Sequence, residues 1–134
     1  MYFRYDESNS IKVPEPFQRI MTPLMMTDNT ASELPFSIHY TEWESGKKID
    51  SHFHENSMEA MACVSGTGKA MVNGEWFDFV PGSMIVADRN DEHSIVNDGS
   101  ETLRVLCVFS PAIGAKDLKD RAFAALEKAT GIKY

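Results

Sequence analysis

At residues 46–66 the chain reads Gly46-Lys-Lys-Ile-Asp-Ser-His52-Phe-His54-Glu-Asn-Ser-Met-Glu59-Ala-Met-Ala-Cys-Val-Ser-Gly66. Side chains two residues apart in a β-strand point to the same face, so His52 and His54 can both aim at one point. Glu59 follows shortly after this pair, and another histidine, His93, stands further downstream. Imidazole nitrogens and a carboxylate are the usual ligands of several divalent metals. The segment therefore predicts a site for one divalent transition metal (Fe, Mn, Ni, Zn or Cu).

The composition limits the classes of partner that the chain can have. Its 134 residues suffice for one domain with a substantial core. Acidic residues outnumber basic ones by 20 to 13, whereas a nucleic-acid-binding surface needs clustered positive charge. The longest apolar runs are too short to span a bilayer, and the N-terminus does not resemble a secretory signal. We expect a cytoplasmic protein with a small-molecule substrate and with no nucleic-acid or membrane partner.

The middle of the chain has the pattern of an all-β fold. Residues 36–43 alternate, which places Ser37, His39, Thr41 and Trp43 on one face of a strand. Asn73-Gly74 separates two strand-like runs and is a strong hairpin signal. Many short strands joined by turns predict an antiparallel sandwich or barrel. The expected strands are 36–43, 58–64, 69–72, 75–80, 83–87, 93–97 and 103–109.

Three segments are expected within a single domain. Residues 1–33, which are irregular and rich in proline, are predicted to form an N-terminal arm packed on the barrel. Residues 34–113 are predicted to form the barrel itself. Residues 114–134 are predicted to be a helical segment, with Gly131 as its C-cap. Its apolar stripe consists of Leu118, Ala122, Ala125, Leu126 and Ala129.

Two of the expected strands, 58–64 and 103–109, are apolar on both faces. A strand of a single-layer barrel has one more polar face, so the outer face of these strands is expected to be covered. The N-terminal arm or a second subunit could cover it, and we favour a homodimer. Cys63 and Cys107 lie in the same strands and are predicted to be buried, reduced thiols.

The histidine segment resembles the first motif of the cupin superfamily, which is glycine, five residues, His-x-His, four residues, glutamate, six residues and glycine. The matching residues are Gly46, His52, His54, Glu59 and Gly66. The second cupin motif is matched in spacing by Gly82, Asp88, Asn90, His93 and Asn97, with Asp88 and Asn90 replacing a proline and a glycine. The resemblance implies a double-stranded β-helix barrel of the jelly-roll class, with one metal bound by His52, His54, Glu59 and His93.

The same residues also allow a simpler interpretation. His52 and His54 could be exposed loop residues, Glu59 a charge at the rim of a strand, and His93 part of a turn. A carboxylate at the head of an apolar strand face, however, costs on the order of several kcal/mol to bury unless it is paired or metal-bound. All four positions also fit one template, and this favours the metal site.

A closer resemblance, to the ectoine synthase family, rests on segments between residues 36 and 111. It rests on matching intervals between residues 36–41, Glu59-Ala60, residues 81–84, residues 88–93 and residues 107–111. It implies closure of a ring with loss of water from an acetylated diamino acid, using iron held by a glutamate, a tyrosine and a histidine. Glu59 and His93 match two of these ligands, whereas Ile85 occupies the position of the tyrosine. The His-x-His pair therefore implies a metal held in the ordinary cupin manner. The acidic tail of that family is replaced by the helical segment.

The face formed by alternate residues of 36–43 is expected to line the same interior as the metal ligands. Polar groups that face a barrel interior are costly unless they bind something, so Ser37, Thr41 and Trp43 are candidate substrate contacts. The alternative is that this face is exposed. His39 is the candidate general acid or base, because the pKa of free histidine lies near neutrality.

Three functions are compatible with these residues. The first is a metal-dependent enzyme acting on a small polar metabolite, an ectoine-synthase-like lyase/cyclase (hydro-lyase) or an isomerase, with the metal as Lewis acid. The second is an Fe(II)-dependent cupin dioxygenase that uses the same ligands. The third is a non-catalytic cupin that binds a small molecule. The resemblance to ectoine synthases favours the first.

Overall fold

The computed structural model of the protein describes residues 1–31 and 33–134. The chain begins with a short 3-10 helix, η1 (Glu7–Asn9), and ends with an α-helix, α1 (Ala115–Thr130). The strands between them are β1 (Ile11–Val13), β2 (Arg19–Met25), β3 (Ser37–Trp43), β4 (Met58–Ser65), β5 (Gly68–Val72), β6 (Glu75–Phe79), β7 (Met84–Ala87), β8 (His93–Val96) and β9 (Leu103–Ser110). No helix in these described ranges is long and apolar enough to cross a membrane.

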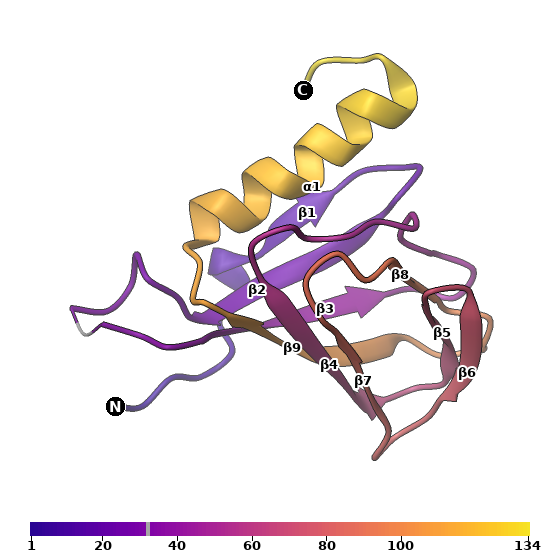
Figure 1. Ribbon diagram of the computed structural model, residues 1–134, viewed down its shortest axis with the longest axis horizontal. Coiled ribbons are helices and arrows are strands. Elements are labelled where there is room, and N and C mark those ends of the chain that lie inside the picture. Colours follow the sequence, from indigo (N-terminus) through magenta and orange to yellow (C-terminus); the bar gives the residue numbers. More distant parts are fainter. Residues whose placement is uncertain (32) are drawn as a thin grey trace.

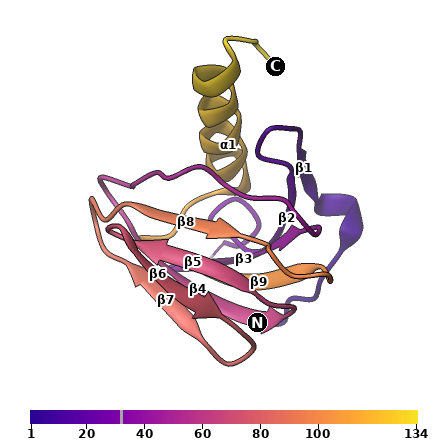
Figure 2. The same ribbon diagram turned by 90° about the vertical axis from the view of Figure 1, so that its right-hand side faces the viewer.

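The strands form two antiparallel sheets. The large sheet has the order β1-β2-β3-β9-β4-β7, and the small sheet has the order β6-β5-β8. Figures 1 and 2 show the two sheets face to face, with helix α1 outside them and beside β1. This arrangement confirms the predicted all-β fold with a C-terminal helix. Within residues 1–31, strand β1 pairs with β2, and β2 pairs with β3 of the large sheet.

The β5–β6 hairpin illustrates how local sequence sets the register. Val72 pairs with Glu75, so the loop consists of Asn73 and Gly74 alone. Both loop residues have positive φ, 49° and 83°, which the right-handed twist of a two-residue hairpin demands. Glycine adopts this conformation freely and asparagine tolerates it, so the dipeptide forms the predicted turn.

The register of the large sheet fixes which side chains face the interior. Strand β3 pairs with β9 without a break, from Ser37 opposite Phe109 to Trp43 opposite Leu103. Alternate side chains of β3, beginning with Ser37, are buried. The predicted inward face of residues 36–43 is therefore an interior face in the structure.

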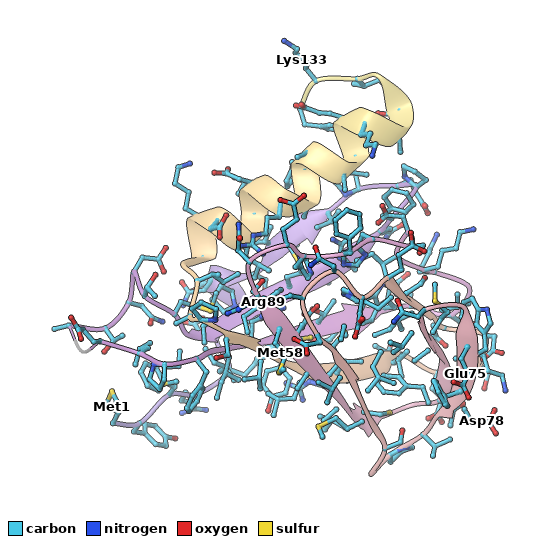
Figure 3. All side chains as sticks on the ribbon, viewed as in Figure 1. Met1, Met58, Glu75, Asp78, Arg89 and Lys133 are labelled. Carbon is cyan, nitrogen blue, oxygen red and sulfur yellow. The ribbon has the colours of Figure 1, made fainter. Side chains whose placement is uncertain are left out.

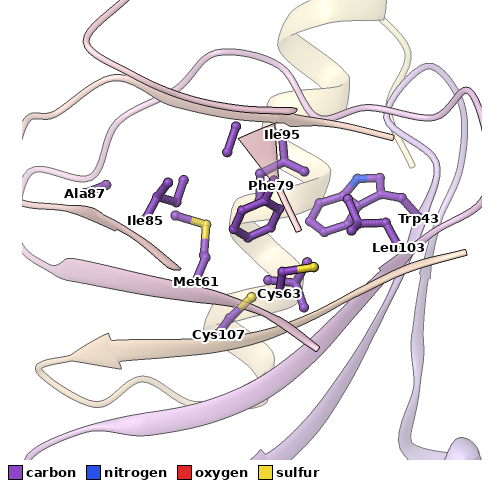
Figure 4. Packing of buried hydrophobic residues seen from close by; sticks show 11 residues of the cluster. Trp43, Met61, Cys63, Phe79, Ile85, Ala87, Ile95, Leu103 and Cys107 are labelled. Atoms are coloured by element: carbon purple, nitrogen blue, oxygen red, sulfur yellow. The ribbon is translucent and has the colours of Figure 1, made fainter. Parts of the chain in front are cut away.

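The main apolar core fills the space between the two sheets (Figure 4). Cys63 and Cys107 belong to this core, and both are unpaired and buried. Other members of the core are Trp43, Met61, Ala70, Phe79, Ile85, Ala87, Ile95, Leu103 and Val105. A second apolar cluster joins helix α1 to the N-terminal strands and contains Val13, Phe17, Met21, Met26, Phe109, Ile113, Leu118, Ala122 and Leu126.

The N-terminus of helix α1 is capped by a residue distant in sequence. Gly114, the N-cap residue, has no side chain to offer, and Asp28, in the loop after β2, takes over the role. The carboxylate of Asp28 accepts hydrogen bonds from the backbone N–H groups of Ala115, at 3.0 Å, and Lys116, at 3.2 Å. A Cβ atom at Gly114 would lie 3.0 Å from Asp28 Oδ2, so this approach favours a residue without one. The cap satisfies two backbone donors at the start of the helix, and the apolar stripe with Leu118, Ala122 and Leu126 is the face that packs against the N-terminal strands.

Candidate metal centre

Two of the predicted ligands are brought together by the backbone. His52 and His93 form an isolated antiparallel bridge, in which His52 N–H donates to His93 O at 3.1 Å and His93 N–H donates to His52 O at 2.9 Å. Their ring centroids are 4.2 Å apart. The pair therefore does not depend on side-chain packing alone.

Glu59 supplies the carboxylate from β4, the strand of the large sheet next to its edge strand β7. On β4 it pairs with Phe109 on one side and Ala87 on the other, and its side chain is buried. Its Oε1 atom lies 3.2 Å from Nε2 of His93 and 3.5 Å from Nε2 of His54. One ligand atom from each of His52, His54, Glu59 and His93 lies within 4.8 Å of all the others. The structure thus brings together all four residues that the sequence predicts as ligands.

Backbone carbonyls orient two of the imidazole rings. His52 Nδ1 lies 2.9 Å from Asp50 O, and His93 Nδ1 lies 3.0 Å from Asp91 O. A carbonyl oxygen can only accept, so each Nδ1 atom carries the proton. In a neutral ring the lone pair is then on Nε2, the atom turned toward the other ligands. This is how metal-binding histidines are usually held.

The third ring, that of His54, is contacted by helix α1. Its Nδ1 atom lies 3.4 Å from Nη1 of Arg121, and Arg121 also lies 3.4 Å from Ser57 Oγ. Asp117, one helical turn before Arg121, pairs with the guanidinium at 3.0 Å. The Nε2 atom of His54 is buried, and among the described residues it has no hydrogen-bond partner despite its proximity to Glu59. A buried polar nitrogen without a partner is rare, and here it faces the other donors.

The electrostatics of the cluster favour a bound cation. Burial acts to raise the pKa of Glu59, but contacts with His54 and His93 outweigh burial and hold it well below its ordinary value. Burial acts to lower the pKa of His93, and the Glu59 carboxylate more than reverses this. Burial and the neighbouring His93 lower the pKa of His52 to about 4, so its ring is neutral near pH 7. The short approach of His93 Nε2 to Glu59 requires positive charge between them, from a proton or from a metal. The donor set fits a divalent transition metal.

A cavity of about 340 Å³ adjoins these four residues. Its walls are the inner face of the large sheet and the side of helix α1 that carries Leu118 and Ala122. Of the residues predicted to contact a substrate, Thr41 and Trp43 line the cavity. Ser37 does not line it. Its fully buried hydroxyl accepts a hydrogen bond from Ile113 N at 3.0 Å, and so holds the chain that leads into α1.

His39, the predicted acid or base, lines the cavity and is buried. Burial lowers its pKa to about 4, so the ring is neutral near pH 7. Its Nδ1 atom has no hydrogen-bond partner in the described structure, and its ring stacks on Phe109 with centroids 5.8 Å apart. One ligand atom each from His39, Glu59 and Cys107 lies within 4.8 Å of the others, so His39 is close to the metal centre.

Sequence reasoning missed two arginines of the cavity wall, Arg19 and Arg121. Arg19 lies in the segment that was expected to be an arm, where no alternation pointed to an interior face. Arg121 lies on the helix beside the apolar stripe, and which group it meets depends on how the helix docks. Neither position carries a local sequence signal for the cavity.

Known proteins resemble this chain in sequence and in fold. The ectoine synthase family model matches residues 22–126. The L-ectoine synthase of Vibrio campbellii is 32% identical over 98 residues, which cover 72% of this chain and 73% of that protein. The L-ectoine synthase of Wolinella succinogenes is 36% identical over 87 residues, covering 63% of this chain and 64% of that protein.

Solved structures confirm the double-stranded β-helix fold. Ectoine synthase from P. lautus superposes with a TM-score of 0.70 at 24% identity, covering 87% of this chain and 78% of that one. KdgF from Halomonas sp. gives a TM-score of 0.73 at 22% identity, covering 88% and 99%. The family match extends over most of the chain, from β2 into helix α1. The chain therefore belongs to the ectoine synthase family, a family of lyases within the cupin superfamily.

Proposed function

We propose that the protein is a metal-dependent lyase/cyclase of the ectoine-synthase type, which removes water from a small polar metabolite. The observation that carries the proposal is the convergence of four ligand atoms, from His52, His54, Glu59 and His93, within 4.8 Å beside a cavity of about 340 Å³. A divalent transition metal bound there would supply Lewis-acid chemistry, polarising a substrate carbonyl or carboxylate.

His39 is suited to move a proton in this reaction. Its buried ring is neutral near pH 7, so Nδ1 or Nε2 is free to accept a proton, and Nδ1 has no competing partner in the described residues. Proton transfer by a positioned side chain contributes about 10²–10⁴-fold to a rate. Stacking on Phe109 holds the ring in place, and Thr41 contributes a hydroxyl to the same wall, 3.6 Å from Cys107 Sγ.

Helix α1 limits the access of water to this reaction. Leu118, Ala122 and Ala125 present apolar surface to the cavity opposite the sheet. An apolar wall strengthens the electrostatic contacts inside the site, and it leaves few water molecules to compete with an intramolecular condensation. The wall therefore suits a reaction in which a ring closes and water leaves.

The proposal concerns the reaction class and not the formation of ectoine itself. Ile85 occupies the position of the family's metal-binding tyrosine, and in the structure it is a buried core residue next to Met61 on the neighbouring strand. Ile85 has no donor atom, so a metal here depends on the histidine-rich set. The same set would also suit an Fe(II) dioxygenase, which oxygen-uptake measurements on iron-loaded protein distinguish from a lyase.

We also propose a homodimer. The outer face of the large sheet carries exposed Met84 and Val86 on its edge strand β7, which pair with Ala62 and Ala60 of β4. Met58, labelled in Figure 3, is exposed at the start of β4. Contiguous exposed apolar surface of this kind is typical of an interface between proteins. It supports the expectation that a second subunit covers the strands that are apolar on both faces.

The proposed function is tested by incubating metal-loaded protein with a panel of N-acetylated diamino acids and following loss of water by mass spectrometry. We expect a cyclised product, and loss of turnover on chelation and in Glu59→Gln. The Arg89→Met variant, altered at an exposed position, should turn over like the wild type. Full turnover by metal-free protein would rule out the metal's role, and oxygen consumption in place of water loss would favour the dioxygenase.

A further inference from the structure

His39, Glu59 and Cys107 form a second cluster of ligand atoms on the inner face of the large sheet. One ligand atom from each lies within 4.8 Å of the other two, and all three residues are buried. His39 and Cys107 are direct partners in the register of β3 and β9. Glu59 on β4 pairs with Phe109, two residues along β9 from Cys107. The backbones of three neighbouring strands therefore hold these side chains side by side.

The imidazole of this cluster has an unused polar atom. Nδ1 of His39 is buried and has no hydrogen-bond partner among the described residues, although the ring lines the cavity. Burial lowers the pKa of His39 to about 4, so the ring is neutral near pH 7, the form in which histidine binds metals. Buried polar atoms are normally satisfied, so an unpartnered nitrogen beside a thiol and a carboxylate points to a ligand that binds there.

We propose that His39, Glu59 and Cys107 form a second metal site, which takes a thiophilic divalent ion such as Zn²⁺. Imidazole, carboxylate and thiolate are all ligands of Zn²⁺, and three protein ligands leave a fourth position to water. On binding, the S–H bond of Cys107 breaks, a sulfur–metal bond forms and the proton leaves to solvent. The carboxylate of Glu59 has two oxygens, so Glu59 is shared between this ion and the metal of the four-ligand centre.

The surroundings of Cys107 suit a metal-bound sulfur. Cys107 lines the cavity, so an ion can reach its Sγ atom by the same route as the four-ligand centre. The hydroxyl of Thr41 lies 3.6 Å from this sulfur and can donate a hydrogen bond to a thiolate. Cys63, the other thiol of the same core (Figure 4), lies 3.5 Å from the backbone carbonyl of Gly66 and is not among the described residues that line the cavity. The two cysteines are therefore expected to differ in their access to metal ions.

The second ion should bind more weakly than the first. Burial and the Glu59 carboxylate raise the pKa of the Cys107 thiol, so removing its proton costs free energy, and two cations that share Glu59 repel each other. The second site therefore fills when the ion is in excess. An ion held by His39 occupies the lone pair that would accept a proton, so excess ion should inhibit turnover. That last consequence rests on the proposed function, whereas the site itself does not.

The test titrates the full chain with Co²⁺, after exchange of any bound metal for Co²⁺, and follows cobalt content and near-ultraviolet absorption. A cobalt–thiolate bond gives a charge-transfer band that imidazole and carboxylate ligands do not give. We expect wild type to take up about two cobalt ions per chain, with the band growing as the second ion binds. Cys107→Ser should take up about one ion and show no band. The matched control Cys63→Ser should bind both ions and keep the band, and excess Zn²⁺ should remove the band by displacing cobalt.

A His54→Ala variant separates the two sites. It weakens the four-ligand centre but leaves the second cluster complete, so it should keep the charge-transfer band. Loss of the band in His54→Ala would place the thiolate on the same ion as the other imidazoles and would overturn a second site. So would a wild type without a band at saturating Co²⁺, or a band that persists in Cys107→Ser.

Folding of the variants is checked independently of the band. Uptake of cobalt at the four-ligand centre and circular dichroism show whether Cys107→Ser is folded. Cys107→Ala, which keeps the position apolar, is a second variant that should give the same result. No measurement here needs turnover, so failure of the lyase reaction and failure of the second site are separate outcomes.

Discussion

Nη1 of Arg121 on helix α1 lies 3.4 Å from Nδ1 of His54, in the loop before β4. A guanidinium can only donate, so this contact favours a His54 ring whose Nδ1 is unprotonated and whose Nε2 carries the proton. That tautomer is the reverse of the one that the backbone carbonyls of Asp50 and Asp91 favour at His52 and His93. A metal bound at His54 Nε2 needs the proton on Nδ1, so the helix and the metal compete for this ring.

Replacing Arg121 with methionine should therefore tighten metal binding. The substitution removes a donor that disfavours the metal-binding tautomer, and it removes a positive charge close to the metal position. We expect the metal dissociation constant to fall by about tenfold, measured by competition with a chelator. Lys119→Met, an exposed site on the same helix, is the matched control. Weaker metal binding in Arg121→Met would mean instead that the arginine positions His54 for the metal.

His39→Asn should alter the pH dependence of stability. The folded-state pKa of His39 is about 4, because of burial, against an ordinary value of 6.5. The unfolded chain therefore binds more protons between these values, so stability from this group is complete above 6.5 and declines as the pH falls toward 4. The variant should show a flatter stability curve across this window in urea unfolding of chelated protein. Curves of equal slope for variant and wild type would contradict a buried, neutral His39.

Asp28 should stabilise the protein through the helix that it caps. Removing an N-cap carboxylate costs about 1 kcal/mol of stability, so Asp28→Ala should lower the free energy of unfolding by about this amount at neutral pH. The hydrogen bond from Ala115 N–H is the largest of the contributions that lower the pKa of Asp28 below its ordinary value of 3.8. The stability that the Asp28 cap contributes is thus present above pH 3.8, and it is lost as the pH falls through the lower folded-state pKa of Asp28.

The control for this prediction is Asp120→Ala on the outer face of the same helix. Asp120 pairs with Lys116 at the surface, and such pairs contribute about 0–1 kcal/mol. Chemical denaturation at neutral and acidic pH measures both variants. Equal losses in the two variants would show that the helix does not depend on its distant cap.

If the protein is a homodimer, a charge placed in the interface should lower the particle mass measured in solution. Met84→Asp places a charge on the exposed apolar face of β7, and it should convert a dimer to a monomer in light scattering. Ile132→Lys, which changes an exposed apolar residue after helix α1, should leave the dimer intact. A wild-type chain that is monomeric at all concentrations would remove the basis for this interface.

Much of the fold and of the metal centre could be predicted because both depend on local patterns. The spacing of His52, His54 and Glu59 places one donor on a strand face and two in the loop before that strand. Alternation in β3 brings Thr41 and Trp43 to the interior. Alternation identifies a face of a strand but not the position along it. Ser37 shares that face, yet it meets the chain that enters α1 and not the cavity.

What could not be predicted depends on contacts between distant segments. Arg19 reaches the cavity because β2 joins the large sheet, a pairing that the irregular sequence around it does not signal. Arg121 meets His54 because helix α1 docks through Leu118 and Ala122 on the cluster that contains Phe109. Each contact joins residues that are far apart in the chain, and no periodicity within either segment encodes it.

The central claim is that His52, His54, Glu59 and His93 hold one metal ion, and metal content tests it most directly. Elemental analysis of untagged protein should find close to one transition metal per chain, and His54→Ala, checked for folding by circular dichroism, should lose it. The element found would also separate redox from Lewis-acid chemistry. Metal-free wild type after reconstitution with each of the five candidate metals, or a His54→Ala variant with full metal content, would contradict the account.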